Sequence, residues 1–168
     1  MPVSDQGVSD DRYRLIPRTL IFLIRGESVL LLKGAPDKRL WAGYYNGVGG
    51  HIERGEDVLT AARRELQEET GLTPDSLWLC GTVTVETNQD TGIGLFVFKG
   101  RSTGGSVRPS LEGSLEWVPF ADLEDKPLVE DLPDLLPVVL ERKPSQPPFH
   151  AHYHYDAEEK LQVRFASP

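Results

Sequence analysis

The chain has 168 residues, 39% of them hydrophobic, and a formal net charge of −8 at pH 7. This length and apolar content suit one compact domain and exclude a disordered acidic chain. The negative charge argues against non-specific binding to duplex nucleic acid, which needs a basic surface, but it does not exclude a small nucleotide substrate. We therefore expect a single soluble domain over residues 1–168, either monomeric or homodimeric.

The N-terminal residues 1–14 form a polar tail without the apolar core of a signal peptide. No apolar run approaches the ~20 residues that a membrane-spanning helix needs. Cys80 is the only cysteine, so an internal disulfide and a thiolate metal cluster are excluded, and we expect a buried structural thiol. These features together predict a cytoplasmic protein.

Two apolar runs open the predicted fold. Residues 18–25 and 28–33 predict a β-hairpin that turns at Gly26-Glu27 and is buried on both faces. A polar, glycine-containing loop follows. Residues 47–52 then predict a short strand that opens into a turn.

A helical pattern begins at Asp57 and continues to Thr70, with Gly71 as the predicted stop. Residues 77–86 and 93–99 return to the composition of strands. The segments predicted after these are a short strand at 115–118, a second helix at 134–142 with Pro137 awkwardly placed inside it, and a C-terminal β-hairpin at 149–166.

Three glutamates share one face of the first predicted helix. Glu65, Glu68 and Glu69 are spaced by three and four residues, so like charges lie about one turn apart, which destabilises an isolated helix. Hard divalent cations such as Mg²⁺ bind carboxylate oxygens and would neutralise such a cluster. The alternative is an exposed helix face whose acids pair with the adjacent arginines. Gly49 and Gly50 favour the metal site, because they let the backbone approach closely and expose its carbonyls as ligands.

The segment from Gly50 through Glu56 to Arg64-Glu65-Leu66-Gln67-Glu68-Glu69-Thr70-Gly71-Leu72 resembles the signature box of the Nudix (MutT-like) hydrolases at every specified position. This resemblance implies the Nudix fold, of α+β or α/β class, in which a mixed β-sheet lies between helices and the box forms a loop-helix-loop. It also implies hydrolysis of a nucleoside diphosphate derivative by attack of water on phosphorus.

The resemblance further implies Mg²⁺ as the cofactor, with Mn²⁺ as a substitute. The metal ligands would be Glu65, Glu68, Glu69 and the Gly50 carbonyl. Glu65 would be the preferred base, Glu68 would share in catalysis, and Arg64 would hold a box carboxylate, Glu56 or Glu53, in position. Glu112 is an additional candidate ligand, because relatives offer a carboxylate from the corresponding loop.

Outside the box the chain is similar to the branch that hydrolyses oxidised purine nucleoside triphosphates. In that branch an asparagine before the glycine run and acidic residues near 127–133 read the base, and here Asn46 and Asp131 stand at those positions. Val129 replaces a stacking aromatic and Leu132 replaces a second acid, so the pattern is only partly kept. Further candidates for the substrate pocket are Thr19, Lys33 and Trp41, with Trp41 as a core or rim aromatic in the alternative.

The product would be a nucleoside monophosphate and pyrophosphate, with 8-oxo-dGTP or another (d)NTP as substrate, in a role that sanitises the nucleotide pool. Hydrolysis of ADP-ribose or of a dinucleoside polyphosphate remains open, as does a non-catalytic module that senses a nucleotide. His150, His152 and His154 alternate along one predicted strand. We expect them to form one face of that strand, opposite an aromatic face, and not a metal site.

Overall fold

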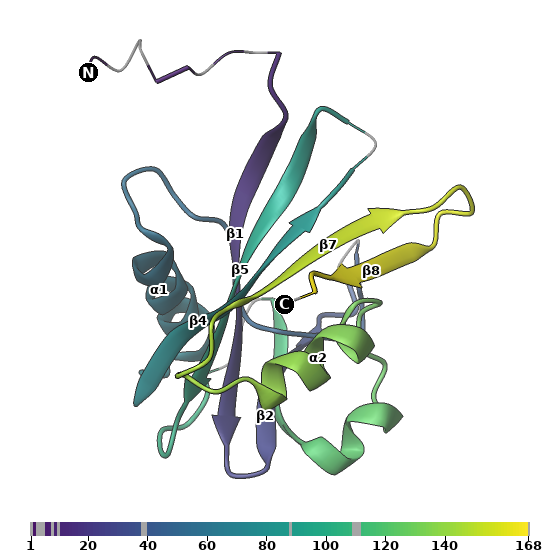
Figure 1. The fold of residues 1–168 in the computed structure, drawn as a ribbon. Coiled ribbons are helices and arrows are strands. Elements are labelled where there is room, and N and C mark those ends of the chain that lie inside the picture. Colours follow the sequence, from purple (N-terminus) through teal and green to yellow (C-terminus); the bar gives the residue numbers. More distant parts are fainter. Residues whose placement is uncertain are drawn as a thin grey trace.

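The computed structural model describes residues 2, 6–7, 9, 11–37, 40–87, 89–108 and 112–167 (Figure 1). Parts of the predicted N-terminal tail, residues 1, 3–5, 8 and 10, therefore lie outside the described residues. The elements in chain order are β1 (Arg14–Arg25), β2 (Ser28–Gly34), β3 (Tyr45–Asn46), α1 (Val58–Thr70), β4 (Ser76–Val85), β5 (Thr91–Arg101), β6 (Gly113–Pro119), the 3₁₀ helix η2 (Phe120–Asp125), α2 (Leu132–Glu141), β7 (Phe149–Tyr155) and β8 (Leu161–Phe165).

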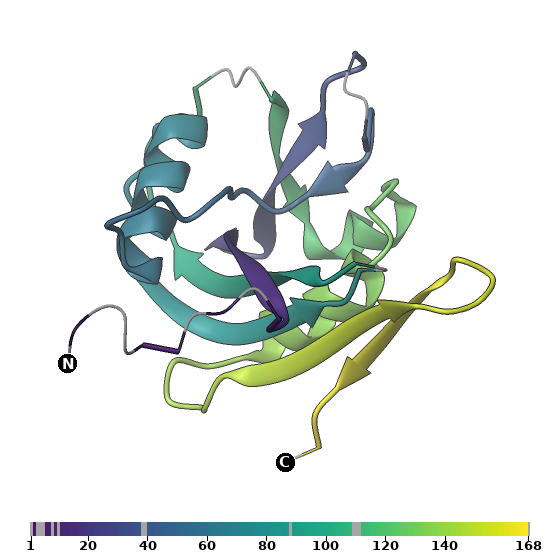
Figure 2. The same cartoon turned by 90° about the horizontal axis from the view of Figure 1, so that it is seen from above.

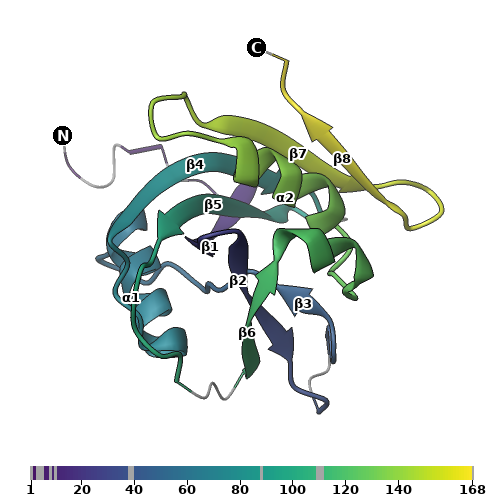
Figure 3. The same ribbon diagram turned by 90° about the horizontal axis from the view of Figure 1, so that it is seen from below.

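The strands form one mixed sheet, as expected for the Nudix fold. Its order is β3-β2-β1-β5-β4-β7-β8, and β6 pairs with β2 off this path. The predicted hairpin of β1 and β2 pairs at only two positions, Ile24 with Val29 and Arg25 with Ser28. Beyond them β1 runs parallel to β5 while β2 pairs with β6, so the two strands separate and the sheet curls (Figure 3).

Each face of the sheet carries one helix and its own apolar core (Figure 1). Alternate residues of β1 divide between the cores: Leu20 and Phe22 belong to the α2 side, whereas Ile21 and Leu23 belong to the α1 side. This double burial is the predicted one. The α1 side also contains Val48, Ala62, Leu66, Leu72 and Phe98, and the α2 side also contains Val83, Val97, Leu132, Leu135 and Tyr153.

Helix α1 begins and ends where its sequence predicts. The Asp57 carboxylate accepts hydrogen bonds from the backbone N–H groups of Leu59 and Thr60, both at 2.9 Å, so Asp57 is an N-cap. Gly71 adopts φ 71°, a left-handed conformation that glycine tolerates without a Cβ clash, and its N–H bonds to the Gln67 carbonyl. The helix that carries the three glutamates is therefore set by its own caps.

Two expectations needed correction, and one short helix was missed. Helix α2 begins at Leu132, not at 134, because Pro133 occupies the first turn, where an N–H would have no partner anyway. Residues 47–52 form no named strand but two isolated bridges to β1, Ile21 with Val48 and Arg18 with His51. The 3₁₀ helix η2 was not predicted, since so short a helix has no extended periodic pattern.

The C-terminal hairpin is β7 and β8, which form the edge of the sheet farthest from β3 (Figure 2). Phe149, Ala151 and Tyr153 are buried on one face of β7, and the three histidines occupy the other, as predicted. Cys80 is buried as expected, and this burial raises the pKa of its thiol to about 12. Within the described part of the chain, no helix is both long and apolar enough to cross a bilayer.

Candidate active site

The loop before α1 is fixed to strand β1 through Gly50 and Thr19. The Thr19 N–H donates to the Gly50 carbonyl at 2.8 Å, and the Gly50 N–H donates to the Thr19 hydroxyl at 3.3 Å. Thr19 is only 3% exposed, so its hydroxyl serves this loop and reaches no open surface. Thr19 is therefore a support for the box, in contrast to its predicted place in the substrate pocket.

Gly50 also lies directly against the carboxylate of Glu65. A Cβ added to Gly50 would stand 2.5 Å from Cδ of Glu65 and 2.5 and 2.6 Å from its two oxygens, distances that real Cβ atoms do not show. The absence of a side chain at position 50 thus lets the carboxylate of α1 approach the backbone. This close approach brings the two predicted oxygen donors, the Gly50 backbone and Glu65, into one place.

Arg64 connects the box acids to each other. Its guanidinium donates to both oxygens of Glu56, at 2.7 and 2.9 Å, and the remaining nitrogen donates to Glu65 at 2.9 Å and to Glu68 at 3.2 Å. The guanidinium nitrogen Nη2, one of the two bonded to Glu56, also donates to the His51 carbonyl at 3.1 Å. The ion pair of Arg64 with Glu56 raises the pKa of Arg64 and lowers the pKa of Glu56. The Glu56 carboxylate also accepts a hydrogen bond from the Glu53 N–H. Arg64 holds Glu56, as expected, and Glu53 contributes only its backbone.

The donors at this site suit a hard divalent cation. Carboxylate and carbonyl oxygens are the ligands that Mg²⁺ prefers, and they are present at Gly50 and along α1. Among the described residues, however, no three His, Cys, Asp or Glu side chains are already grouped as a metal site. The Glu65 side chain is 13% exposed and that of Glu68 is 61% exposed, each bound to Arg64. To ligate an ion, these carboxylates would have to turn from Arg64 toward it.

The two remaining predicted ligands are placed differently from each other. Glu69 is on the same helix and is half-buried. Glu112 lies at the start of β6, where its backbone carbonyl accepts a hydrogen bond from Ala35 at 3.1 Å, beside the end of β2 and not on α1. The structure therefore groups Glu69 with the box, but it associates Glu112 with a neighbouring loop.

The two segments that contain the predicted base-reading residues are joined by backbone hydrogen bonds. The segment before α2 runs along β3: the Tyr45 N–H donates to the Pro127 carbonyl at 2.8 Å, and the Val129 N–H donates to the Tyr45 carbonyl at 3.0 Å. These bonds align the segment that leads to Asp131 with the strand that contains Asn46. The Asn46 Oδ1 accepts the Gly47 N–H at 2.7 Å, so its role as a turn former is real and its amide nitrogen is the group left for a ligand.

Asp131 lies at the N-cap of α2 without capping it. Burial raises the pKa of Asp131, and the nearby hydroxyl of Tyr153 is itself buried without a hydrogen-bond partner among the described residues. Val129 and Leu132 are 2% and 0% exposed, so they belong to the core and have no surface for stacking on a base. Asp131 is thus a half-buried acid close to the Tyr153 hydroxyl of β7.

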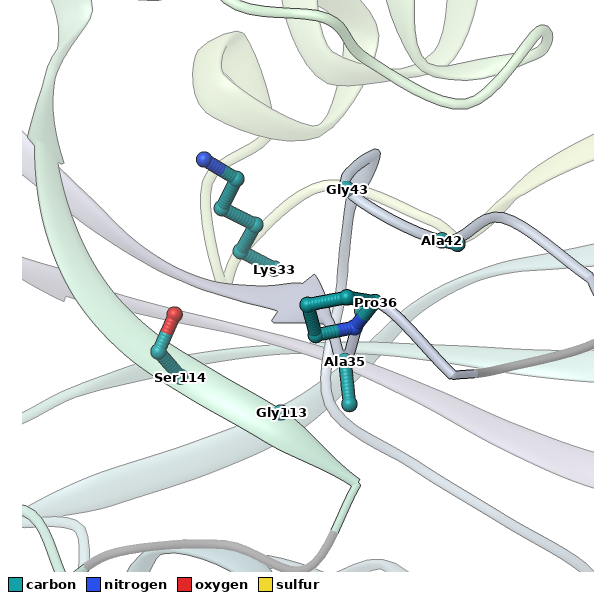
Figure 4. Close-up of a pocket in the computed structure, with 8 residues that line it drawn as sticks. Lys33, Ala35, Pro36, Ala42, Gly43, Gly113 and Ser114 are labelled. Carbon is teal, nitrogen blue, oxygen red and sulfur yellow. The ribbon is translucent and has the colours of Figure 1, made fainter.

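A pocket with a volume of about 710 Å³ lies between the loop after β2 and the start of β6 (Figure 4). The Lys33 ammonium and the Ser114 hydroxyl are its polar side-chain groups. Trp41, on the same loop, is 55% exposed and adopts φ 58°, so it is not a core aromatic. Its carbonyl packs so close to Gly34 that a Cβ there would lie 2.4 Å away. The pocket contains the predicted Lys33 and has Trp41 on its bounding loop.

Beside this pocket is a polar cluster that the sequence analysis missed, because its members are far apart in the chain. The Glu116 carboxylate accepts hydrogen bonds from the Tyr45 hydroxyl at 2.5 Å and from the Lys126 ammonium at 2.6 Å. Lys33 stands over the Tyr45 ring at 5.5 Å from its centroid. The Lys126 and Tyr45 donors lower the pKa of Glu116.

Glu116→Gln is expected to lower the free energy of unfolding by about 1 kcal/mol at pH 7, a small value because the side chain is 42% exposed. Because the folded state depresses the pKa of Glu116, its stabilisation is present above the unfolded pKa and is lost as pH falls through the folded pKa. Urea unfolding at pH 7 and pH 3 should therefore show the difference from wild type shrinking at pH 3. Exposed Glu124→Gln is the control. An equal deficit at both pH values would contradict the prediction.

The chain is similar to known proteins in both its sequence and its structure. The family model described as NUDIX domain matches residues 14–139. The oxidized purine nucleoside triphosphate hydrolase of Danio rerio is 33% identical over 111 residues, which cover 62% of this chain and 70% of that protein. The 8-oxo-dGDP phosphatase of Mus musculus is 33% identical over 110 residues, 61% of this chain and 32% of that protein. The crystal structure of a MutT protein from Bacillus halodurans has a TM-score of 0.76 and 26% identity, covering 92% of this chain and all of that one.

Proposed function

Since this chain belongs to the Nudix family of hydrolases, we propose that it is a magnesium-dependent enzyme that cleaves a purine nucleoside triphosphate, such as 8-oxo-dGTP, to the monophosphate and pyrophosphate. The observation that carries the proposal is the close contact between Gly50 and the carboxylate of Glu65. Glu65 lies on helix α1, which also carries the other two box glutamates. A non-catalytic sensor would have no need to retain these acids together. The oxidised purine is proposed from the name of the Danio rerio relative and from Asn46 and Asp131.

Within the box, Glu65, Glu68, Glu69 and the Gly50 carbonyl would hold the cation. When bound, Mg²⁺ supplies neutralisation of the phosphate charge and a lower pKa for the attacking water. Glu65 would accept the proton of that water, since its side chain is the least exposed of the three that are bound to Arg64. Arg64 would keep Glu56, Glu65 and the His51 carbonyl in register, as a positioning residue.

At the other end of the substrate, the Asn46 amide nitrogen and the Asp131 carboxyl group would bind the edge of the base. A purine edge offers both hydrogen-bond donors and acceptors, which this pair complements. With Leu132 in place of a second base-reading acid and no stacking aromatic at Val129, we expect modest selectivity, about tenfold for 8-oxo-dGTP over dGTP. Lys33 and Trp41 stand at the adjoining pocket and would contact the substrate there.

The test is a comparison of kcat/KM for 8-oxo-dGTP, dGTP, 8-oxo-dGDP, ADP-ribose and a diadenosine polyphosphate, with Mg²⁺, with Mn²⁺ and with EDTA. We expect pyrophosphate from the triphosphates, activity with either metal and none with EDTA. A clear preference for ADP-ribose would overturn the triphosphate assignment. Release of phosphate from 8-oxo-dGDP at a higher kcat/KM would favour the diphosphatase activity named for the Mus musculus relative. A chain that binds these nucleotides but cleaves none would be a sensor.

A further inference from the structure

Arg18 and His51 face each other across an isolated antiparallel bridge next to Gly50. The hydrogen bonds on either side of this pair join Thr19 N–H to the Gly50 carbonyl at 2.8 Å and Ile52 N–H to the Pro17 carbonyl at 3.2 Å. The two residues themselves exchange no backbone bond, which defines a non-hydrogen-bonded pair, the type whose side chains lie closest together. The nitrogen-bearing side chains of Arg18 and His51 therefore lie side by side. His51 is the residue directly after Gly50, the glycine that touches Glu65.

These two side chains lie on the face of β1 opposite to Thr19. Thr19 bonds to Gly50, whose missing side chain points at Glu65, and Arg18 is its immediate neighbour in an alternating strand. Arg18 thus shares the face of Leu20 and Phe22, which is the α2 side of the sheet. Helix α2 carries Asp131 at its start. Arg18 and His51 therefore face the α2 side of the sheet, while the backbone of His51 adjoins Gly50 of the box.

Within the described part of the chain, the guanidinium of Arg18 has no acidic partner. Its Nε is shut off from solvent and has no hydrogen-bond acceptor among the described residues, and none of their carboxylates forms a salt bridge with it. The rest of the side chain remains partly exposed. Among the described residues, Arg18 is thus a half-buried arginine whose Nε has no acceptor. Leaving a buried donor unpaired costs free energy, which an anionic ligand would offset.

We propose that Arg18, assisted by the ring N–H of His51, binds a phosphoryl oxygen on the nucleoside-monophosphate half of the substrate. The proposal rests on the proposed function and deepens it, because it assigns the phosphate that lies between the base and the box. The planar guanidinium matches phosphate oxygens through parallel N–H donors, and its charge does not depend on pH near neutrality. The box would then hold the pyrophosphate half, so each product has its own site.

Product inhibition distinguishes the two halves. In Arg18→Gln we expect KM for the triphosphate and the Ki of dGMP to rise about 10- to 100-fold, while the Ki of pyrophosphate stays within about twofold. Arg18→Lys should give intermediate values, because lysine keeps the charge but not the planar fork. With EDTA present, dGMP should raise the Tm of wild type and not that of Arg18→Gln, a readout that needs no turnover.

The matched control is Arg101→Gln, which makes the same change in charge at an exposed position at the end of β5. Arg101 is six residues along β5 from Leu95, the partner of Arg18, or about 20 Å, so both Ki values should stay at wild type. A wild type that cleaves nucleoside triphosphates while Arg18→Gln keeps both Ki values would overturn the Arg18 assignment alone. An equal rise in both Ki values, with a lower Tm, would make Arg18 structural. A wild type that cleaves no nucleotide would overturn the proposed function itself.

Discussion

Glu65→Gln is expected to reduce kcat by about 10³-fold, because the substitution removes both a proton acceptor and a ligand charge while it preserves the shape of the side chain. The Glu65 carboxylate lies between Gly50 and the Arg64 guanidinium and is 13% exposed, so the protein holds it in one place. The free energy of unfolding should change little. The neutral amide oxygen can still accept from Arg64, and the repulsion among the three acids of α1 is relieved. Steady-state kinetics and urea unfolding of the same preparation measure the two effects.

The matched control is Glu27→Gln, at an exposed turn position between β1 and β2 that carries the same loss of charge. It should keep wild-type kcat. Glu65→Gln with wild-type kcat for every nucleotide tested would show that Glu65 does no chemistry. A loss of kcat together with a large fall in Tm would instead show that the carboxylate maintains the fold.

Gly50→Ala should reduce kcat/KM by about 10²-fold without unfolding the protein. The added methyl group would lie 2.5–2.6 Å from the atoms of the Glu65 carboxylate, so that carboxylate must move by a fraction of an ångström to an ångström. A displacement of that size at a reacting group costs about 10²-fold in rate. Gly50 has no left-handed φ, so alanine does not strain the backbone there, and the effect isolates the position of the carboxylate.

Gly104→Ala is the control for Gly50→Ala, because a Cβ at Gly104 meets no atom within 4 Å and the position has no left-handed φ. It should keep wild-type activity. The double variant Gly50→Ala/Glu65→Gln should be no slower than Glu65→Gln alone, since both changes act through one carboxylate. Fully additive losses would mean that Gly50 acts through some other group, such as its own carbonyl.

Features that depend on residues close together in the chain were predicted from the sequence, whereas features that depend on contacts between distant segments were not. Helix α1 was predicted from Asp57 to Gly71 because its caps and its spacing are local, and hydrogen bonds within the segment confirm both ends. Residues 47–52 were predicted as a short strand, and their pairing with β1 was not predicted. Their bridges form with β1, some thirty residues earlier in the chain, where strand β2 has already turned away.

The candidate site divides in the same way. The contact of Arg64 with a box carboxylate, Glu56 or Glu53, was implied by the resemblance of the box to the Nudix signature, and the hydrogen bonds show that the carboxylate is Glu56. The cluster of Tyr45, Glu116 and Lys126 could not, because three separate elements contribute one residue each. Thr19 was expected in the substrate pocket, but its hydroxyl is used by Gly50, a contact that exists only after β1 and the box loop have paired.

The box from Gly50 to Leu72 therefore determined the family and the kind of chemistry from sequence alone, because its donors lie within a few helical turns and their spacing is a local property. Which face of the sheet each side chain of β1 occupies was decided only by the tertiary structure. The parallel pairing of β1 with β5 and the antiparallel bridge to His51 turn Thr19 toward the box and Arg18 away from it. A strand alternates its side chains, so one residue of register selects the face, and that register is set by contacts far apart in the chain.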